Sequence, residues 1–496
     1  MIKDKGYYLD IFKVDGAMLD RLIATALSSG GSYADLYFEY TTYNELSMTD
    51  SSVNRGGFHE DYGVGIRVLD GEKTGYAYSE STVPADMLAA AKAASAIAGK
   101  GMGAVAVGKV MGAVAVGKVM GAVAAGKGRA INPAQAPADC DFYPWTESWR
   151  ECPNSNLIPL MAETDRLIRS REPRVSKLNL RFSASESDVL MYNSAGELRW
   201  DSRPMYNFAV SAVFTDGKGR NVSGGGSRSF RKGFEGLPTA AEMAALVLKD
   251  LDMAFEAKRP KGGRMPVVMG AGASGILLHE AMGHAFEADF IRKGSSIFKD
   301  RLGEMICPAG INIVDDGTIA GNRGSGNYDD EGVAGRKTYM VRDGRLESYL
   351  HDRISAAHFG VEPTGNGRRE DFRCDPLPRM RATYMENGNC KPEDLVASVR
   401  KGIYVDEFSN GQVRIGEGDF TFFVKRGRLI ENGRLTMPVK DINIIGNGPE
   451  ALRHIEMVGN DAAMEDASWT CGKGQSVPVS CGMPSVLVSG LTVGGE

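Results

Sequence analysis

The sequence lacks several features that commonly decide the class of a protein. It has seven cysteines in 496 residues, an odd number without regular spacing, so a disulfide framework is not expected. No segment reaches the roughly 18 uncharged apolar residues that a membrane helix needs, so we expect no membrane span. Basic residues are not in excess, because the formal net charge is -5, whereas nucleic-acid-binding proteins usually display a net basic face. These absences argue against a disulfide-rich secreted protein, a membrane protein and a nucleic-acid-binding protein.

The composition is that of a soluble globular protein, with 43% hydrophobic and 24% charged residues. A chain of 496 residues is too long for one ordinary hydrophobic core, which predicts two or three domains. The N-terminal stretch MIKDKGYYLDIFKVDG contains charges and lacks the apolar region of a secretory signal. We therefore expect the cytoplasm as the location.

Residues 1–260 are predicted to form a mixed α/β N-terminal domain. Strand-like alternation begins near residue 33, and Asp70-Gly71 is a strong hairpin-turn signal. Helices are expected at 84–98, 157–171 and 238–257, with alternating strands between the second and the third. Helices and antiparallel hairpins thus come in groups, which is typical of the α+β class. The stretch KRPKGGRMP after the third helix is the expected boundary with a second domain.

A low-complexity repeat interrupts this domain at residues 99–128. MGAVAVGKV occurs twice and is followed by MGAVAAGK, so lysines recur every nine residues. Nine residues make about 2.5 helical turns, so successive lysines would point to opposite sides and leave no consistent buried face. Each unit also contains G-x-x-x-x-G-K, which resembles a phosphate-binding loop, but valine stands where that loop needs serine or threonine. We therefore expect a mobile excursion without a nucleotide site.

Residues 261–496 are predicted to form a largely β C-terminal domain that carries one site-bearing helix. The run VVMGAG predicts a strand followed by a glycine turn, and Ser274 is the expected N-cap of the helix that contains LLHEAMGHAFEA. Beyond about residue 310 helical signals are sparse, and turn signals such as Asp343-Gly344 and Asn432-Gly433 separate strand-like runs. The whole chain is therefore expected to be α+β, with two domains.

The stretch LLHEAMGHAFEADF places two histidines five residues apart around a glutamate: His279, Glu280 and His284. The zinc motif H-E-x-x-H has one residue fewer and sets both imidazoles on one helix face. On a regular α-helix five residues rotate a side chain by about 500°, which leaves the two histidines roughly 140° apart. A π-bulge adds one residue to the turn and brings both to the same face, and Gly283 lowers the steric cost of that bulge. A shared metal therefore requires a locally distorted helix.

Two interpretations of this stretch remain open from the residues alone. The first is a catalytic zinc site, and the second is an amphipathic core helix with two satisfied polar histidines. A catalytic zinc needs a third protein ligand and an open position for water. The chemically suitable residues are Glu287, Cys307, His351, His358 and Cys471, and spacing does not choose among them. In a catalytic site, Glu280 would act as the general base on a zinc-bound water.

Three charged residues are further candidates for binding a substrate. Arg368 and Arg369, in GNGRRE, would hold a peptide carboxylate, with a solvated turn as the alternative. Asp330, in the acidic run from Asp329 to Glu331, would bind a substrate amine, with a solvent-facing turn as the alternative.

Several separated motifs occur in this chain in the order of one known family. They are ADLYFEY, YGVGIRVLDGEKTGYAY, GAGASGILLHEAMGHAFEADF, VDDGT, DDEGVAGRKTY, PTGNGRRE, MVGND and CGKGQSVPVSCGMPSVLVSGLTVGG. Together they resemble the TldD/PmbA family of metallopeptidases, and in particular its TldD-type subunits, which keep both motif histidines. The resemblance covers nearly the whole chain apart from the repeat, which is the clear departure from the family pattern.

The resemblance implies a C-terminal domain that binds zinc through His279, His284 and Cys471, with Glu280 as the catalytic base. It implies hydrolysis of peptide bonds in unfolded or flexible peptides. It also implies a dimer, formed either by two copies of the chain or with a TldE/PmbA-like homologue. The alternative function is a non-catalytic peptide-binding or regulatory subunit of such a complex.

Overall fold

The computed structural model describes residues 3–99, 113–114, 141–145, 147–151, 154–465 and 467–495. Most of the predicted repeat at 99–128, including its phosphate-loop-like unit, lies outside the described residues. Among the helices that are described, none is long and apolar enough to cross a membrane.

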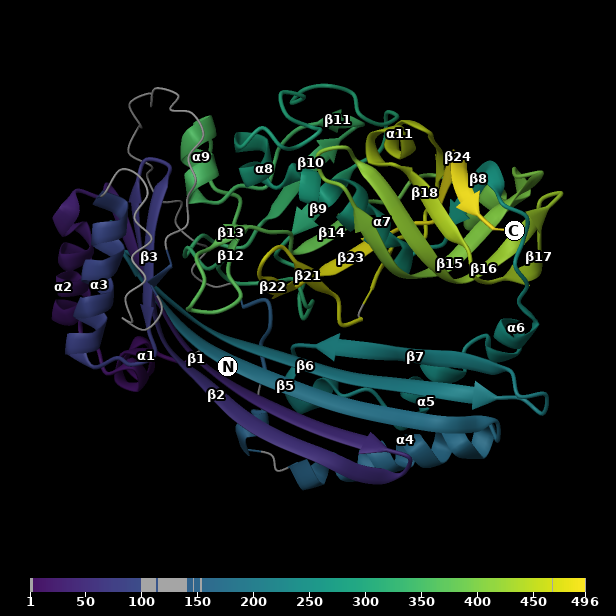
Figure 1. Ribbon diagram of the computed structural model, residues 1–496, viewed down its shortest axis with the longest axis horizontal. Helices are drawn as coiled ribbons and strands as arrows, with labels where there is room; N and C mark the ends of the chain where they lie inside the picture. The colour runs from purple at the N-terminus through teal and green to yellow at the C-terminus, as the bar shows by residue number, and fades with distance from the viewer. Residues whose placement is uncertain are drawn as a thin grey trace.

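A long antiparallel sheet forms the N-terminal half, with the strand order β4-β3-β2-β1-β5-β6-β7 (Figure 1). The strands are β1 (Tyr33–Thr49), β2 (Ser52–Asp70), β3 (Lys73–Ser79), β4 (Ala113–Val114), β5 (Val175–Asn193), β6 (Leu198–Thr215) and β7 (Asn221–Phe230). Alternation gives the sheet one apolar face, because Leu180 and Phe182 on β5 are buried while Arg181 between them is exposed. The predicted hairpin at Asp70-Gly71 is confirmed, since β2 ends and β3 begins on either side of this turn.

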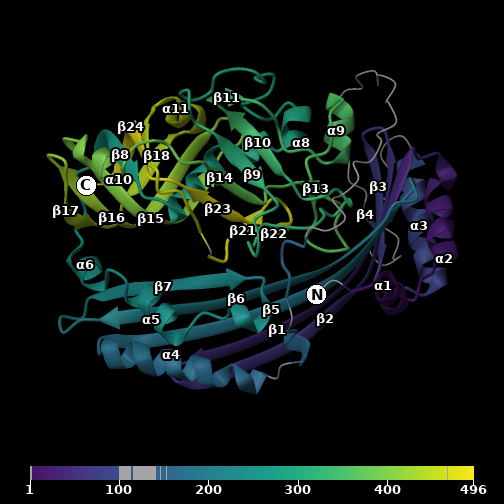
Figure 2. The same cartoon turned by 180° about the vertical axis from the view of Figure 1, so that it is seen from behind.

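Helices cover the sheet in two groups, one at the β3 end and one below β5–β7 (Figures 1 and 2). The first group consists of α1 (Lys5–Phe12), α2 (Gly16–Ala26) and α3 (Pro84–Gly99), and the second of α4 (Ile158–Arg171) and α5 (Ala240–Leu248). Helix α6 (Leu251–Glu256) follows α5 and contacts both β7 and β17. The helices predicted at 84–98 and 157–171 are confirmed as α3 and α4. The single helix predicted at 238–257 is wrong, because Asp250 adopts a left-handed conformation (φ 56°) and separates α5 from α6. Helix propensity alone does not report such a local break.

The C-terminal half consists mainly of two sheets. The first has the order β11-β10-β9-β14-β23-β20, and the second has the order β15-β8-β24-β18-β16-β17. Because β15 also pairs with β16, five strands of the second sheet close into a ring. The strands of the two sheets are β8 (Gly263–Met269), β9 (Ile313–Asp316), β10 (Lys337–Arg342), β11 (Arg345–Leu346), β14 (Ala382–Met385), β15 (Lys401–Val413), β16 (Asp419–Glu431), β17 (Arg434–Val439), β18 (Asn443–Asn447), β20 (Ala463–Met464), β23 (Ser480–Met483) and β24 (Val486–Gly494).

Shorter elements complete this half. Strand β19 (Ile455–Val458) pairs with β24, and two ribbons are formed by β12 (Gly367–Arg368) with β13 (Leu377–Pro378) and by β21 (Thr470–Gly472) with β22 (Ser476–Pro478). The helices are α7 (Ile276–Leu278), α8 (Ala288–Arg292), α9 (Arg353–Phe359), α10 (Pro392–Ala397) and α11 (Gly448–Arg453). The predicted turns at Asp343-Gly344 and Asn432-Gly433 are confirmed between β10 and β11 and between β16 and β17. The predicted α+β class, with a largely β C-terminal half, is confirmed.

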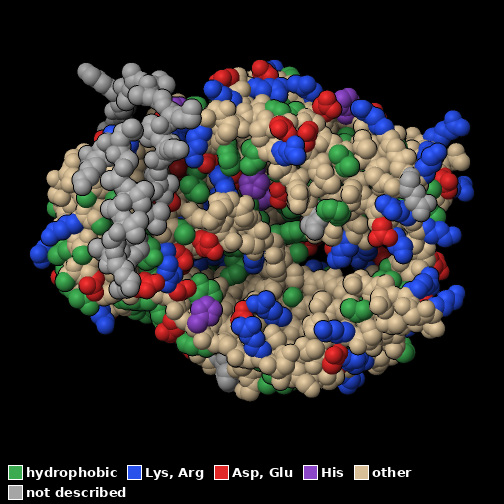
Figure 3. All heavy atoms as spheres, in the orientation of Figure 1, with side chains coloured by type: hydrophobic (Ala, Val, Ile, Leu, Met, Phe, Trp, Pro, Cys, Tyr) green, Lys and Arg blue, Asp and Glu red, His purple; other side chains and the backbone are tan. Residues whose placement is uncertain are grey.

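Buried polar contacts join the two halves at the end of the sheet near β3. Arg67 on β2 is fully buried, donates to Asp35 on β1 at 2.9 Å and pairs with Glu331 of the C-terminal half at 2.7 Å. Nearby, Glu39 accepts a hydrogen bond from the backbone N–H of Phe372 at 2.8 Å. Farther along the sheet, Figure 3 shows a hollow between its polar face and the C-terminal half. The predicted domain division after residue 260 falls in the link between α6 and β8, and it stays a prediction.

Candidate metal centre

The segment that carries the two histidines follows β8 and is not one regular helix. It passes from a 3-10 turn at Ala273–Gly275 through α7 into a π-helical turn at His279–Gly283, and then into a second 3-10 turn. Glu287 is extended, and α8 begins after it. The predicted N-cap is wrong, because Ser274 lies inside the first 3-10 turn and its buried hydroxyl has no partner in the described part of the chain.

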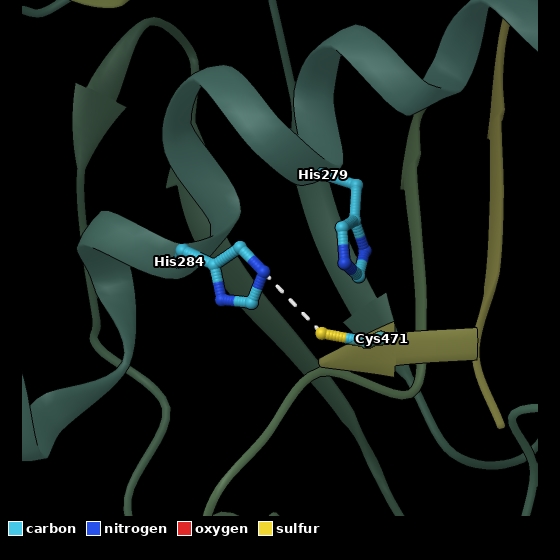
Figure 4. Close-up of side chains that lie close together, drawn as sticks. All are labelled: His279, His284 and Cys471. Carbon is cyan, nitrogen blue, oxygen red and sulfur yellow. Dashed lines mark hydrogen bonds between the residues drawn. The ribbon is translucent and has the colours of Figure 1, made fainter. Parts of the chain in front are cut away.

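The π-helical turn is the distortion that the histidine spacing requires. The N–H of His284 donates to the carbonyl oxygen of His279, five residues earlier, so the extra residue is absorbed within one turn. Both imidazoles consequently point to the same side of the segment (Figure 4).

Close packing at two glycines encloses this turn. A Cβ atom on Gly283 would lie 2.1 Å from Sδ of the buried Met380. A Cβ atom on Gly448, at the start of α11, would lie 2.2 Å from the carbonyl oxygen of Ala281. Both separations are far below a van der Waals contact, so only glycine fits at these positions without a shift. Tertiary packing therefore holds the π-helical turn in place.

Cys471 on β21 completes a cluster with the two histidines. One ligand atom from each of His279, His284 and Cys471 lies within 4.8 Å of the others, and all three residues are buried. Nε2 of His284 is 3.3 Å from Sγ of Cys471 (Figure 4). Ligands around a tetrahedral zinc are separated by roughly 3.5 Å, given zinc–nitrogen and zinc–sulfur bonds of about 2.0 and 2.3 Å. The donor set and its spacing therefore fit a zinc ion with one coordination position left open.

The electrostatics of the cluster also fit a cation. Burial opposes ionisation of the Cys471 thiol, but the two imidazoles bring its pKa down to about 5, so the thiolate is the favoured form at neutral pH. Nδ1 of His279 is buried and has no hydrogen-bond partner among the described residues. A thiolate beside an unsatisfied imidazole is a costly arrangement without a ligand. This cost is what a bound metal ion would remove.

His284 is oriented by a buried carboxylate. Its Nδ1 is 3.0 Å from Oε2 of Glu287, whose side chain is fully buried. Burial alone would raise the pKa of Glu287, but Lys473, His284 and Arg379 lower it to about 2. Glu287 is therefore a carboxylate that accepts a hydrogen bond from Nδ1 of His284. Against the effect of burial, Glu287 and Cys471 raise the pKa of His284 well above its usual value, and its Nε2 faces Sγ of Cys471.

Glu280 follows His279 in the π-helical turn and is partly exposed, unlike both histidines. It does not belong to the His-His-Cys cluster. Glu280 is thus adjacent in sequence to a member of the cluster but outside it, and its role as a general base stays a prediction.

The other proposed third ligands lie elsewhere. His358 bonds to Glu72 at 2.5 Å, His351 packs between Tyr349 and Phe359, and Cys307 is buried with Sγ 3.8 Å from the carbonyl oxygen of Gly344. None of them joins the described cluster. Among the described residues, the geometry therefore groups Cys471, and none of these three residues, with the two histidines, and the ligand set stays a prediction.

The three predicted substrate-binding residues are buried and bond within the protein. Arg368 donates to the carbonyl oxygens of Met380 and Pro478 at 2.6 and 2.8 Å. The backbone N–H of Arg369 donates to Asp330 at 2.8 Å, and Asp330 also pairs with Arg203. The alternative of a solvated turn is wrong for both motifs because the surrounding segments cover them. Their role in binding a substrate stays a prediction.

Two basic residues near the cluster were not predicted. Arg379 donates to the carbonyl oxygen of Cys471 at 2.6 Å, and Lys473 pairs with Glu287 at 3.1 Å. Lys473 stands two positions after Cys471 in CGKGQ, which was the only local signal for it. Arg379 is remote in sequence from both ligand segments, so no local pattern could have identified it.

Together, the fold and the cluster define an α+β protein with a buried site suited to a divalent metal. Comparison with known families identifies it further. Models for the PmbA/TldA metallopeptidase domain 1, central domain and C-terminal domain match residues 34–98, 147–257 and 262–495. The chain belongs to the PmbA/TldD metallopeptidase family.

Named relatives agree with this assignment over nearly the full length. The chain is 37% identical to the metalloprotease TldD homolog of Haemophilus influenzae over 470 residues, covering 93% of each chain. It is 35% identical to the metalloprotease TldD homolog of Buchnera aphidicola over 474 residues, covering 93% of this chain and 92% of the relative. Among solved structures, TldE from Thermococcus kodakarensis has a similar fold, with a TM-score of 0.71, 18% identity, and coverage of 96% of this chain and all of that one.

Proposed function

We propose that this protein is a zinc-dependent peptidase that hydrolyses peptide bonds in unfolded or flexible peptides. The observation that carries the proposal is the buried cluster of His279, His284 and Cys471, assembled by a π-helical turn from residues remote in sequence. Three protein ligands with an open fourth position are typical of catalytic zinc, whereas structural zinc is usually closed by four. The relatives named metalloprotease support the reaction class.

In this proposal the three clustered side chains hold the ion, and Glu280 moves the protons. Bound zinc would supply a Lewis acid that lowers the pKa of a water molecule and polarises the carbonyl of the peptide bond. The Glu280 carboxylate accepts the proton of the attacking water and returns it to the amine nitrogen as the C–N bond breaks. Glu287 keeps the proton of His284 on Nδ1 throughout, so Nε2 stays directed at the ion.

The proposed substrate is an extended peptide. Strand addition to a sheet edge recognises the backbone more than the side chains and gives broad sequence tolerance. We further propose that the working unit is a dimer, either of two identical chains or with a TldE-like homologue. Sedimentation of the purified chain, alone and mixed with such a homologue, distinguishes the two.

Metal content tests the site before any activity assay, because it does not depend on a partner or on the right substrate. Elemental analysis of the wild type should give about one zinc per chain, as expected for a single three-ligand site. Cys471→Ala should lose most of it, whereas the control Cys374→Ala, outside the cluster, should keep it. Full zinc in Cys471→Ala would remove this residue from the site. No zinc in the wild type would favour the non-catalytic binding subunit.

The role of Glu280 is tested by Glu280→Gln, which keeps the size and removes the base. We expect wild-type zinc content and a fall in kcat of about 10²- to 10⁴-fold, the usual contribution of a general base. The control is Glu417→Gln, at an exposed glutamate. Wild-type rates in the Glu280 variant would contradict the mechanism.

A further inference from the structure

Two segments that carry the clustered residues are tied together by buried charges. Lys473, on the segment of Cys471, reaches the segment of His284, where its Nζ is 3.1 Å from Oε2 of Glu287 and 2.6 Å from Oδ1 of Asp289. Its side chain is only 10% exposed. The same Nζ donates to the carbonyl oxygen of Pro378 at 3.1 Å. One ammonium group therefore joins three segments that are far apart in sequence.

Arg379 makes a second connection between the same segments. Its guanidinium donates to the carbonyl oxygens of Cys471 at 2.6 Å and Gln475 at 2.9 Å. Its Nε lies 3.9 Å from Oε1 of Glu287, and both side chains are fully buried. A guanidinium carries its donors in a rigid planar fork, so these contacts set the backbone of Cys471 relative to Glu287.

We propose that Glu287, Arg379 and Lys473, here called the charged bracket, are positioning residues for the metal site. The bracket holds Nε2 of His284 and Sγ of Cys471 at the separation that one ion needs. Glu287 acts on the histidine through Nδ1, while Arg379 and Lys473 hold both Glu287 and the cysteine segment. The inference rests on the proposed metal site and extends it to residues that contact no metal.

The physical reason for such a bracket is the irregularity of both ligand-bearing segments. His284 lies where a π-helical turn passes into a 3-10 turn, and Cys471 lies on a ribbon of only two strands. Neither segment is held by a long ladder of backbone hydrogen bonds. Groups outside the ligand set commonly orient metal-bound histidines, and their loss typically lowers metal affinity on the order of 10- to 100-fold.

The test compares Glu287→Gln and Lys473→Met with the control Lys293→Met. Lys293 also faces Asp289, at 3.7 Å, but its side chain is 58% exposed and it pairs with none of the three bracket residues. The measurements are zinc affinity, by competition with a chromophoric chelator, and the visible spectrum of the cobalt-substituted protein. The cobalt spectrum reports thiolate coordination and ligand geometry without requiring peptide hydrolysis.

We expect both bracket variants to lose about 10- to 100-fold in zinc affinity and to show a shifted or weakened thiolate-to-cobalt band. Lys293→Met should behave as the wild type. Lys473→Arg, which keeps the charge, should recover part of the affinity. Thermal unfolding of the metal-free proteins separates these effects from a failure to fold, because folded variants should melt close to the control.

Two contrary outcomes are distinguishable. If the wild type binds zinc but the folded bracket variants match it in affinity and cobalt spectrum, the bracket is overturned and the proposed metal site stands. If the wild type binds neither zinc nor cobalt, the metal site itself is wrong and the bracket falls with it. If the bracket variants lose zinc affinity as expected but the wild type hydrolyses no peptide, the result supports the bracket and contradicts only the proposed reaction.

Discussion

Strands β1 and β5 pair from Asp35↔Asn193 to Thr49↔Asn179 without a register shift, whereas residues 273–292 change conformation several times within a short stretch. The sheet repeats one local rule, in which alternate side chains face the helices and backbone bonds form a ladder. The histidine-bearing segment follows no such rule, and it is enclosed by Met380 and Gly448. The stability of the regular sheet depends mainly on the burial of its apolar side chains, so an exposed side chain can change at little cost. The conformation of residues 273–292 depends instead on contacts with segments remote in sequence. The following variants test these two sources of stability separately.

The largest effect should come from removing an apolar group below the regular sheet. Phe182 on β5 is fully buried in the cluster that includes Phe208 and Met243. Phe182→Ala should lower the free energy of unfolding by about 3–5 kcal/mol, because it removes a large side chain and leaves a cavity. The measurement is urea denaturation. Zinc per folded chain should stay at the wild-type value, and a loss of zinc would show that the two regions are coupled.

A pH effect of roughly 3 kcal/mol at most should arise on the regular sheet, where Glu39 on β1 accepts a hydrogen bond from the backbone N–H of Phe372. Burial, with a smaller contribution from Asp371 and Asp330, raises the pKa of Glu39 from 4.5 to about 7 in the folded protein. Below pH 4.5 the carboxyl is protonated in both folded and unfolded states, and its burial costs nothing extra. As the pH rises from 4.5 through 7, the unfolded state releases the proton first, so the folded state loses stability.

The variant Glu39→Gln tests this sign. Relative to the wild type, its free energy of unfolding should rise between pH 4.5 and pH 8, because it cannot ionise. The control Glu60→Gln, at an exposed glutamate on β2, should change little over the same range. Parallel stability curves for wild type and Glu39→Gln would show that Glu39 does not titrate in this window.

A smaller but more specific effect is expected at Gly448. Its added Cβ in Gly448→Ala would meet the backbone carbonyl of Ala281, which no side-chain rotation can move away. Overpacking of this kind costs about 1–3 kcal/mol. Zinc affinity should fall as well, because the displaced carbonyl belongs to the π-helical turn. The same substitution at Gly57 on β2, where a Cβ meets open space, should leave both quantities nearly unchanged.

The smallest effect on the free energy of unfolding is expected at Arg181, the residue next to Phe182. Arg181 neighbours Phe182 on β5 but faces the opposite side, is 58% exposed and pairs with Glu45. Arg181→Ala should change the free energy of unfolding by less than about 0.5–1 kcal/mol, the usual worth of an exposed ion pair. If Arg181→Ala lowered the free energy of unfolding as much as Phe182→Ala, the alternation of buried and exposed side chains along β5 would not decide how much each residue stabilises the sheet.

The sequence predicts the structure correctly where one local signal decides it. The turns at Asp70-Gly71 and Asn432-Gly433 and the helices α3 and α4 were all expected from residues within one or two turns of each other. The spacing alone also showed that a metal shared by His279 and His284 requires a π-bulge, because two side chains five positions apart do not face the same way on a regular helix. The predicted cap at Ser274 is wrong, because the chain enters a 3-10 turn there and the Ser274 hydroxyl has no partner among the described residues.

The candidate site divides in the same way. His279, Glu280 and His284 are visible as a motif. The five-residue spacing between the histidines indicates that the helix must contain a π-bulge if both bind one metal. The choice of Cys471 over Glu287 or His351 as the third member came from a family resemblance, not from spacing. In the fold, Cys471 adjoins the histidines, and Arg379 and Lys473 contact Glu287 beside them: Arg379 also donates to the carbonyl oxygen of Cys471, and Lys473 belongs to the segment of Cys471.

The sequence by itself determined the α+β class, the main turns and the condition that a metal shared by His279 and His284 needs a distorted helix, because each depends on hydrophobic period, local dihedral preference or helical spacing. Only the tertiary structure decided that the distortion occurs at His279–Gly283, that Cys471 joins it, and that Arg368, Arg369 and Asp330 are buried. These outcomes depend on packing and charge between residues as distant in sequence as Tyr76 and Arg369, which are 293 positions apart. No local pattern contains that information.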